Sequence, residues 1–483
     1  MEREPIKKTI IQNHQTRKEF FTHQKTWEKI RKQFFKDLKL DRFGADVIII
    51  ATGHQPLFYY PGIIFKNYYT HKIAGMAKGI PVNFIVDTDE AIVQIVIPGK
   101  NENIFFKKLM ELKNPDKKAY FHFKPSQEEV KHFFIRIEKE IKGLDDTRTN
   151  KAFRDYFKSF LELFSNNHDF VETISFLRRQ WEKSLQFPVL DIRISRLSDS
   201  IAFAQFIWEL VKDIDRFTEI YNDAVQKVKK NEYQAVKYLT RENNTFELPF
   251  WYIGKSREEV FLKKEIDQLL IFTPLENLLT LSMKENDNVS IQKLKRIKLV
   301  PKAVTLTLIL RLFFADLFIH GTGGQFYDRV TDEILMRFYH LNTLPFAMAT
   351  GNIYLPLFEA MMTREKEYRE KKDFLKELKY HPEKYLTEDK SKKYISERKA
   401  LARLLSCQSD PVQRKSIHDK LTRLGEQATQ SLKDRITDTK KEISRAENII
   451  KFKDVFAERK YPYFLFPGSF PFIQYLDRGK LIV

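Results

Sequence analysis

The fold of this chain is decided by the run VIIIAT at residues 47–52, which leads directly into GHQP at residues 53–56. A helical segment then reaches to about residue 78, and a second apolar run over residues 82–86 ends in the acidic sequence DTDE at residues 87–90. Short β-branched runs with little polar alternation are typical of strands buried on both faces. Two such runs around a helix predict a βαβ unit with parallel strands.

Polar side chains follow both predicted strands. Gly53, His54 and Gln55 come after the first strand, and Asp87 and Asp89 come after the second. Ligands of parallel α/β sheets collect beyond the carboxyl ends of the strands, so these residues mark a candidate crevice. A histidine between glycine and glutamine at the end of a buried strand is an unusual packing choice. His54 is therefore the first candidate for a catalytic or phosphate-binding residue.

A second strand, glycine loop, helix and strand unit follows later in the chain. An apolar run ends at His320 and leads into GTGG at residues 321–324, a helix that contains Asp328, and the run LPFAMAT at residues 344–350. In a doubly wound sheet the first strands of the two halves are neighbours, so their loops face one crevice. Glycine lets backbone amides approach phosphate oxygens, and a helix N-terminus adds partial positive charge. The residues predicted to bind a cofactor phosphate from this loop are His320, Gly321, Gly323 and Gly324.

Neither loop is a Walker A sequence or a full dinucleotide fingerprint, so the loops favour ATP or another nucleotide only in general terms. Asp87 and Asp89 share one face if their strand continues that far, and they are candidate catalytic residues that would hold Mg²⁺ or orient a ribose or an amine. The alternative is that they cap a turn. Lys66, one to two turns into the first helix, either reaches a phosphate or lies on the surface.

Three further residues are candidates for substrate binding. Ser195 and Arg196 follow the strand-like run at residues 187–194, where they would meet an anionic or polar substrate group. Asp328 lies on the helix after the second glycine loop, on the same face as neighbouring polar residues. Whether the protein needs a metal cannot be read from these residues.

The composition bounds the partners and the compartment. The chain has 483 residues, with 84 Lys and Arg against 65 Asp and Glu, a net charge of +19. A basic excess favours nucleotides, phosphorylated metabolites, nucleic acid or a membrane surface. Much of it lies in mixed-charge segments after Met361, which are typical of solvated helices, so nucleic acid is the weaker alternative.

A single cysteine, Cys407, excludes an intrachain disulfide and a cysteine-based zinc cluster, and it indicates a reducing compartment. No charged residue beside Cys407 would activate it, so we interpret it as incidental. The N-terminus is charged and lacks a signal-peptide core. The most apolar run, residues 304–319, contains Arg311 and Asp316 and is shorter than the ~20 residues of a membrane span. We therefore expect a cytoplasmic protein with a buried core segment here.

Beyond Met361 glycine nearly disappears and charge dominates. Asp410 and Pro411 form a helix start, and an approximate a/d pattern predicts one helix from Pro411 to about Arg459, ~70 Å long. The predicted fold is α/β: a Rossmann-like parallel sheet core with a helical insertion and a long antiparallel coiled-coil arm, which suits a homodimer contact. The predicted domains are the first half of the core (1–125), the insertion (126–245), the second half of the core (246–360), the arm (361–458) and a return to the core (459–483).

These motifs resemble a known family. TGHQP at residues 52–56, with Gly62, Lys66 and DTDE at residues 87–90, is similar to the Gly-Gln-Gln, Gly-Pro, Lys and Asp-His-Asp pattern of bacillithiol biosynthesis cysteine-adding enzymes. Residues 301–311, the second glycine loop and the long charged helices fall in the same order. The resemblance implies a core similar to class I aminoacyl-tRNA synthetases and nucleotidylyltransferases, a coiled coil that promotes dimerisation, and condensation of cysteine with the amine of a glucosamine–malate conjugate.

The chain departs from that pattern at two positions. His54 replaces the first glutamine of the loop, and Thr88 replaces the histidine of the acidic motif. If those positions select the substrate, this chain uses another amine or acid. The leading hypothesis is a nucleotide-binding ligase that joins an activated carboxylate or amino acid to the amine of a small metabolite. The alternatives are an RNA-binding or assembly protein on a degenerate nucleotide fold, and a nucleotidyltransferase.

Overall fold

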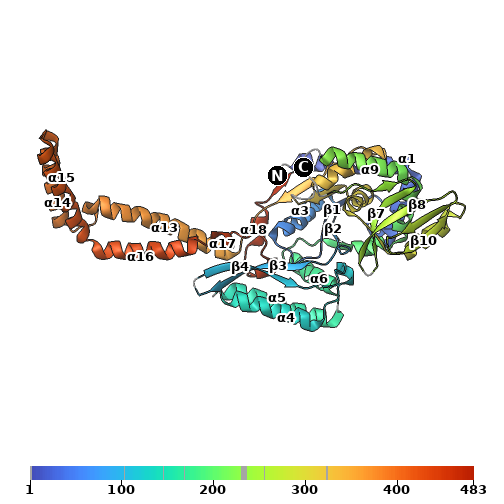
Figure 1. Cartoon of the computed structure of the whole chain (residues 1–483), viewed down its shortest axis with the longest axis horizontal. Coiled ribbons are helices and arrows are strands. Elements are labelled where there is room, and N and C mark those ends of the chain that lie inside the picture. Colours follow the sequence, from blue (N-terminus) through green and yellow to red (C-terminus); the bar gives the residue numbers. More distant parts are fainter. Residues whose placement is uncertain are drawn as a thin grey trace. The chain divides into compact units, whose positions relative to one another are not determined.

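The computed structural model describes residues 3–102, 104–144, 146–167, 169–229, 236–254, 256–321 and 325–482. The chain divides into two compact units (Figure 1). Unit 1 comprises Met1–Ile97, Lys108–Ile353 and Arg459–Val483, and unit 2 comprises Pro98–Lys107 and Tyr354–Glu458.

Unit 1 is built on a six-stranded sheet in the order β14-β13-β12-β1-β2-β5. Its first five strands in the chain pair in parallel, and only β14 is antiparallel. The strand order reverses between β1 and β12, where the Thr52 hydroxyl donates to the Ile319 carbonyl at 2.7 Å. The parallel unit predicted from residues 47–86 is confirmed. The strands are β1 (Ile49–His54), β2 (Ile80–Ile85), β5 (Leu190–Arg193), β12 (Leu317–His320), β13 (Ala347–Thr350) and β14 (Lys480–Ile482).

Helix α3 (Pro61–Ala77) connects β1 to β2 and packs on both strands. Proline at its first position suits a helix start, because the missing N–H has no intrahelical partner there. The ring of Phe65 lies between two glycine backbones: a Cβ on Gly351 would come within 2.2 Å of it, and one on Gly479 within 2.3 Å. Both positions therefore require glycine for α3 to approach β13 and the C-terminal segment.

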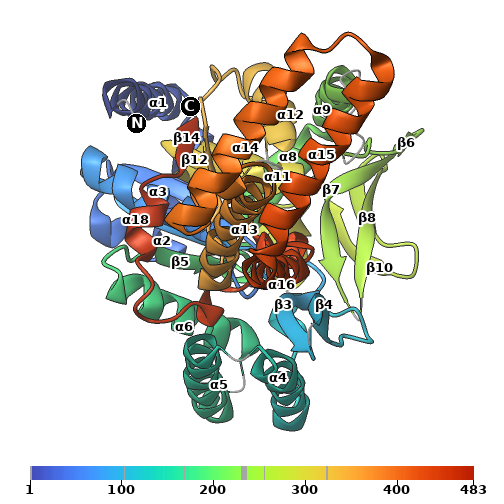
Figure 2. The same ribbon diagram turned by 90° about the vertical axis from the view of Figure 1, so that its left-hand side faces the viewer.

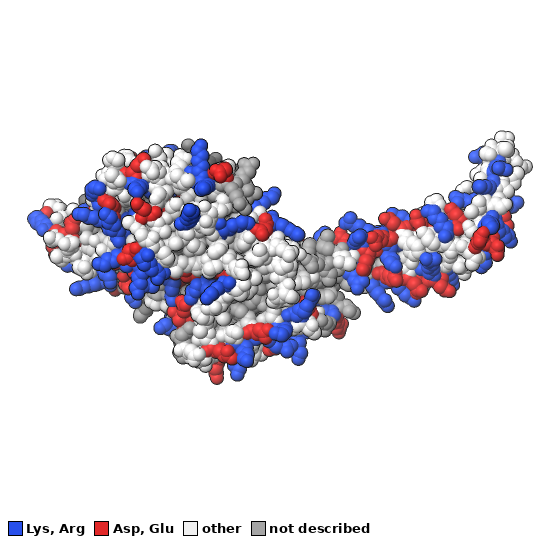
Figure 3. Space-filling view, turned by 180° about the vertical axis from the view of Figure 1, so that it is seen from behind, with Lys and Arg blue, Asp and Glu red and all other residues white. Residues whose placement is uncertain are grey.

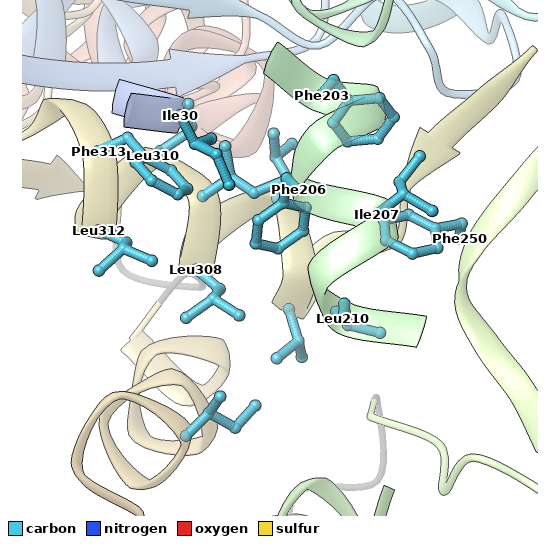
Figure 4. Close-up of a cluster of buried hydrophobic side chains, with 14 of the residues drawn as sticks. Ile30, Phe203, Phe206, Ile207, Leu210, Phe250, Leu308, Leu310, Leu312 and Phe313 are labelled. Atoms are coloured by element: carbon cyan, nitrogen blue, oxygen red, sulfur yellow. The ribbon is translucent and has the colours of Figure 1, made fainter. Parts of the chain in front are cut away.

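The core of unit 1 is aliphatic and aromatic (Figure 4). It brings together α2 (Lys25–Asp37), α8 (Ile201–Lys212), α11 (Ala303–Ile309) and the π-helical turn Leu310–Phe314. The run at residues 304–319 is buried, as expected from its composition. No helix in the described part of the chain is long and apolar enough to cross a membrane. Helix α1 (Arg3–His23) precedes α2 in the chain.

The charged residues of that apolar run are buried with partners. Asp316 accepts hydrogen bonds from Arg17 of α1 at 2.5 Å and from the Ile49 N–H at 2.7 Å, so it fastens α1 to the start of β1. Burial opposes ionisation of Asp316, yet Arg17 and the hydrogen bonds hold its pKa below the usual value. Arg311 pairs with Asp332 at 2.6 Å.

A second, antiparallel sheet has the order β10-β9-β8-β7-β11, with β6 on β7. Its strands include the antiparallel hairpin of β7 and β8. Their bounds are β6 (Arg241–Glu242), β7 (Thr245–Ile253), β8 (Arg257–Lys264), β9 (Gln268–Phe272), β10 (Asn277–Ser282) and β11 (Leu299–Pro301). A separate pair is formed by β3 (Val93–Asn101) and β4 (Ile104–Leu112).

Helices α4 (Gln127–Lys142), α5 (Thr147–Asn167) and α6 (Phe170–Ser184) pack in sequence (Figure 2). Ser126 and Glu129 form a capping box at the start of α4. These three helices lie within the segment predicted as a helical insertion, residues 126–245. The other helices of unit 1 are α7 (Ile194–Ser198), α9 (Ile214–Lys229), α10 (Asp287–Arg296), α12 (Gln325–Arg337) and α18 (Phe472–Leu476).

Unit 2 consists mainly of helix pairs. α13 (Pro356–Tyr380) packs on α16 (Lys433–Ile450), and α14 (Glu388–Cys407) packs on α15 (Pro411–Gln430) (Figure 2). Asp410 caps α15 with Pro411 at its first position, as predicted. The single helix predicted from Pro411 to about Arg459 is wrong, because the chain leaves the helix after Gln430 and again before α17 (Lys453–Phe456).

Candidate functional site

A cavity of about 550 Å³ lies at the carboxyl ends of β1, β12 and β13. This β1–β12 cavity opens where the strand order of the parallel sheet reverses, which is where α/β sheets bind ligands. Its walls come from the loop after β1, the start of α3, α11 and the segments after β12 and β13. The sequence-predicted residues that line it are Gly53, His54, Gln55, Lys66, Asp89, His320 and Gly321.

Lys66 supplies a buried amine to the β1–β12 cavity. Its side chain crosses from α3 to the end of β1, where Nζ donates to the Gly53 carbonyl at 2.7 Å. A Cβ on Gly321 would lie 3.8 Å from the Lys66 stem, so Lys66 stands between the two glycine loops. Burial lowers the pKa of Lys66 to about 7. Within the described chain no carboxylate lies at ion-pair distance from its amine.

His54 lines the same cavity in a neutral form. Burial, assisted by the nearby Lys66 charge, lowers its pKa to about 3. Its Nδ1 lies 3.3 Å from the Gln55 carbonyl oxygen, which can only accept a hydrogen bond. Nδ1 therefore carries the proton and Nε2 is left as an acceptor. In this state His54 accepts from a hydroxyl or amine, and it donates to a phosphate only after protonation.

A buried polar network supports His54 from behind. The Tyr59 ring meets the imidazole edge-to-face, with centroids 5.8 Å apart. The Arg178 guanidinium lies over the Tyr59 ring, 5.1 Å from the ring centroid, and it forms ion pairs with both Glu182 and Asp191. His54 therefore packs on a buried tyrosine ring that lies next to these ion pairs.

Gln55 and Asp89 form one wall of the cavity. The Gln55 amide donates to the Asp89 carboxylate at 3.0 Å. The second oxygen of Asp89 accepts from Arg257 at 3.2 Å, and Arg257 stacks on Trp251. The loops after β1 and β2 are thereby joined, as the sequence predicted, and linked to the antiparallel sheet.

Asp87 has a different environment from Asp89. β2 ends at Ile85, so the alternation of strand faces does not reach these two residues. Asp87 is fully buried and accepts from the Ser195 backbone N–H at 2.8 Å, the Ser195 hydroxyl at 2.5 Å and Arg193 at 2.7 Å. Its carboxylate therefore fastens the end of β5 to the end of β2, and the two aspartates do not share a site.

Ser195 and Arg196 do not line the β1–β12 cavity. Ser195 is bound to Asp87, and the exposed Arg196 lines a separate cavity beside Arg193. In the other predicted loop, His320 is buried and its Nε2 lies against the carboxylate of Asp328. Asp328 also lies 3.4 Å from Arg311, so it holds the helix after the loop. Asp328 does not line the β1–β12 cavity.

Two predicted phosphate-binding residues, Gly323 and Gly324, lie outside the described residues. Of that loop, the structure describes His320 and Gly321, which both line the cavity. Among the described residues, no group of three or more His, Cys, Asp or Glu side chains has the arrangement of a metal site.

Sequence reasoning missed six polar residues that line the cavity: Tyr60, Thr307, Thr350, Asn352, Arg459 and Lys460. Arg459 donates to the Asn352 side chain at 3.0 Å, which connects the start of the C-terminal segment to the loop after β13. Burial raises the pKa of Tyr60, although Arg459 opposes this change. A basic pair at the end of a charged helical region has no distinguishing pattern, so only the fold reveals it.

The cavity lining is cationic. Lys66, Arg459 and Lys460 line it, and among the described lining residues Asp89 is the one acidic side chain, which already binds Gln55 and Arg257. Backbone at Gly53 and Gly321 adds surface without side chains, where a ligand can approach closely. The arrangement suits an anion with several oxygens.

The fold and this site define a mixed α/β protein with a cationic cavity at the strand-order reversal of its parallel sheet. Neither the models of known protein families nor the curated proteins give a match to the chain. A proposal of function therefore rests on the geometry of the cavity.

Proposed function

We propose that the protein is a nucleotide-binding, ligase-like enzyme with a Rossmann-like core, which activates a carboxylate or amino acid and transfers it to the amine of a small metabolite. One observation carries the proposal: a buried lysine with no carboxylate partner among the described residues lines a cavity where parallel α/β sheets bind ligands. A phosphate group is the anion that such a lysine and two glycine loops accommodate best.

Phosphate binding would change the charge state of the cavity. Burial holds the pKa of Lys66 at about 7, and a bound phosphate supplies the opposite charge that favours its ammonium form. Arg459 and Lys460 add positive charge at the opening. His54, with Nε2 as an acceptor, suits a ribose hydroxyl or an amine.

The chemistry follows from this arrangement of charges. A carboxylate oxygen attacks the γ-phosphorus of ATP and ADP leaves, which forms an acyl phosphate, or it attacks the α-phosphorus and pyrophosphate leaves, which forms an acyl nucleotide. The amine, after losing a proton, then attacks the carbonyl carbon of the acyl phosphate or acyl nucleotide, and the phosphate-bearing group departs to leave an amide. Lys66 and Arg459 stabilise the negative charge that moves onto the phosphate oxygens.

The resemblance suggests cysteine as the amino acid, and the two departures from the family pattern bear on this differently. His54 lines the cavity and can affect the substrate directly. Thr88 is buried and does not line the cavity, so its replacement of histidine affects packing in the loop after β2.

The test is calorimetric titration of ATP and ADP into the wild type, Lys66→Met and a control, Lys29→Met. Lys29 is an exposed lysine of α2 that does not line the cavity. We expect Lys66→Met to weaken nucleotide binding at least tenfold while Lys29→Met leaves it unchanged. Equal affinity in all three proteins would remove the assignment.

The alternatives make separate predictions. A nucleotidyltransferase would release pyrophosphate together with a nucleotide-linked product, whereas a ligase would release phosphate or a nucleoside monophosphate when the amide forms. RNA binding would require an affinity that falls steeply with salt. On the face drawn in Figure 3, basic and acidic side chains are interspersed over the helices of unit 2, which favours a solvated surface over a nucleic-acid footprint.

We also propose that unit 2 carries a homodimer contact. Leu404 of α14 and Val412 of α15 are exposed by 58% and 75%, and Ile395 is also exposed. Light scattering at several concentrations should show a dimer that Leu404→Glu dissociates. A monomeric wild type, or a dimer unaffected by both Leu404→Glu and Val412→Glu, would exclude this contact.

A further inference from the structure

A second cavity, of about 560 Å³, adjoins the β1–β12 cavity. The two share Gln55, Tyr60, Asp89 and Lys460, so the Gln55–Asp89 hydrogen bond belongs to their common wall. We call it the β3–β4 cavity, because β3, β4 and the chain before β3 supply much of its lining. A ligand in one cavity would meet a ligand in the other across this wall.

The β3–β4 cavity has apolar walls that remain exposed. Ile92 and Leu109 line it with 54% and 57% of their surfaces accessible, and Leu57 is half-buried beside them. Tyr120 also lines the cavity, and its hydroxyl accepts a hydrogen bond from the Ile92 N–H and donates one to the Ile92 carbonyl. Exposed aliphatic side chains that gather within a cavity are typical of a site for a ligand with an apolar body.

The polar groups of this cavity are not equally available. Arg257 is bound to Asp89 and stacked on Trp251. Glu90 is half-buried at the same wall, and within the described residues its carboxylate has no hydrogen bond or ion pair. A half-buried carboxylate without a partner favours a cationic donor.

We propose that the β3–β4 cavity binds the amine substrate, and that this substrate is an ammonium group on an apolar body, with the ammonium at Glu90 and the body against Ile92 and Leu109. The assignment of this ligand as a substrate rests on the proposed function of the β1–β12 cavity. The shared wall then sets the amine beside the place where the activated carboxylate would form.

The test uses three probes of one shape: hexylamine, hexanol and hexanoate, titrated into the full-length protein without nucleotide and followed by ligand-observed NMR. We expect hexylamine to bind at least tenfold more tightly than hexanol, and hexanoate to bind more weakly than either. Tighter binding of hexanoate, or equal binding of all three, would overturn the proposal.

Two variants localise the probe. Glu90→Gln should weaken hexylamine about tenfold without changing hexanol, and Ile92→Ser should weaken both. Glu128→Gln, a substitution of an exposed glutamate in the first turn of α4, is the matched control. Hexylamine binding that is unchanged in Glu90→Gln would refute the site.

The same proteins separate this inference from the proposed function. Glu90 does not line the β1–β12 cavity, so ADP should bind Glu90→Gln as it binds the wild type. If the wild type binds hexylamine but does not bind ADP, the ligase assignment is refuted and the amine site remains. ADP binding without hexylamine binding would remove the amine site alone.

Discussion

Replacing Lys66 by methionine should stabilise the protein at neutral pH. Burial moves the Lys66 pKa from 10.5 to about 7. Each pKa unit corresponds to about 1.4 kcal/mol, so the folded state is disfavoured by up to about 5 kcal/mol relative to an unfolded chain with an ordinary lysine. Methionine removes this term and also the hydrogen bond to Gly53, worth about 1 kcal/mol. We expect a gain of about 2–4 kcal/mol at pH 7.

The sign of the pH dependence follows from linkage. Above pH 10.5 the amine is neutral in both the folded and the unfolded state, so burial has no effect through its charge. As the pH falls from 10.5 to 7, the unfolded chain takes up a proton that the folded chain does not, and the stability of the wild type decreases. Below pH 7 the difference is constant. The advantage of Lys66→Met should therefore be full at pH 7 and vanish near pH 10.5.

Urea unfolding at pH 7, 8.5 and 10 measures this difference, with exposed Lys29→Met as the control. Lys29→Met should differ from the wild type by less than about 0.5 kcal/mol at every pH. A Lys66→Met variant that is less stable than the wild type at pH 7, or a difference that does not change with pH, would refute the account of Lys66 as a desolvated amine.

Two further predictions concern the frame of the cavity. Gly351→Ala should destabilise the protein by about 3 kcal/mol, because a Cβ would lie 2.2 Å from the Phe65 ring. Gly425→Ala, at a position in α15 with no atom near the new Cβ, should instead stabilise its helix by about 1 kcal/mol. Calorimetric melting of both variants measures the two changes. Asp87→Asn should lower the free energy of unfolding by about 2–3 kcal/mol because it removes the buried charge that binds Arg193, and an undiminished stability in urea would contradict the anchoring role.

The parallel strands around the cavity could be predicted because their local pattern agrees with their environment. Residues 49–51 are fully buried on both faces of the sheet, and an uninterrupted β-branched run is what such burial requires. The positions of the glycine loops could be predicted for the same reason, because Gly53 lies at the end of β1 and Gly321 directly follows β12. The type and order of the strands therefore predicted that both loops line one cavity. The strands that carry these loops pair through Thr52 and Ile319, which are 267 residues apart in the sequence.

Side-chain roles were harder to predict because they depend on long-range partners. The residues near Asp87 in the sequence do not predict its hydrogen bond with Ser195, which lies 108 residues away. The hydrophobic pattern after Pro411 is compatible with one long helix, and the breaks after Gln430 and Ile450 carry no glycine or proline signal. Arg459 enters the cavity only because the chain returns to unit 1 at that residue.

The central claim is that phosphate in the β1–β12 cavity is bound by the buried amine of Lys66. Calorimetric titration of ADP at pH 8, in two buffers with different ionisation enthalpies, counts the protons exchanged on binding. Because Lys66 has a pKa of about 7 in the free protein and a phosphate partner raises it, the wild type should take up between half a proton and one proton. Binding of ADP without proton uptake, or no binding of ADP, would contradict the account.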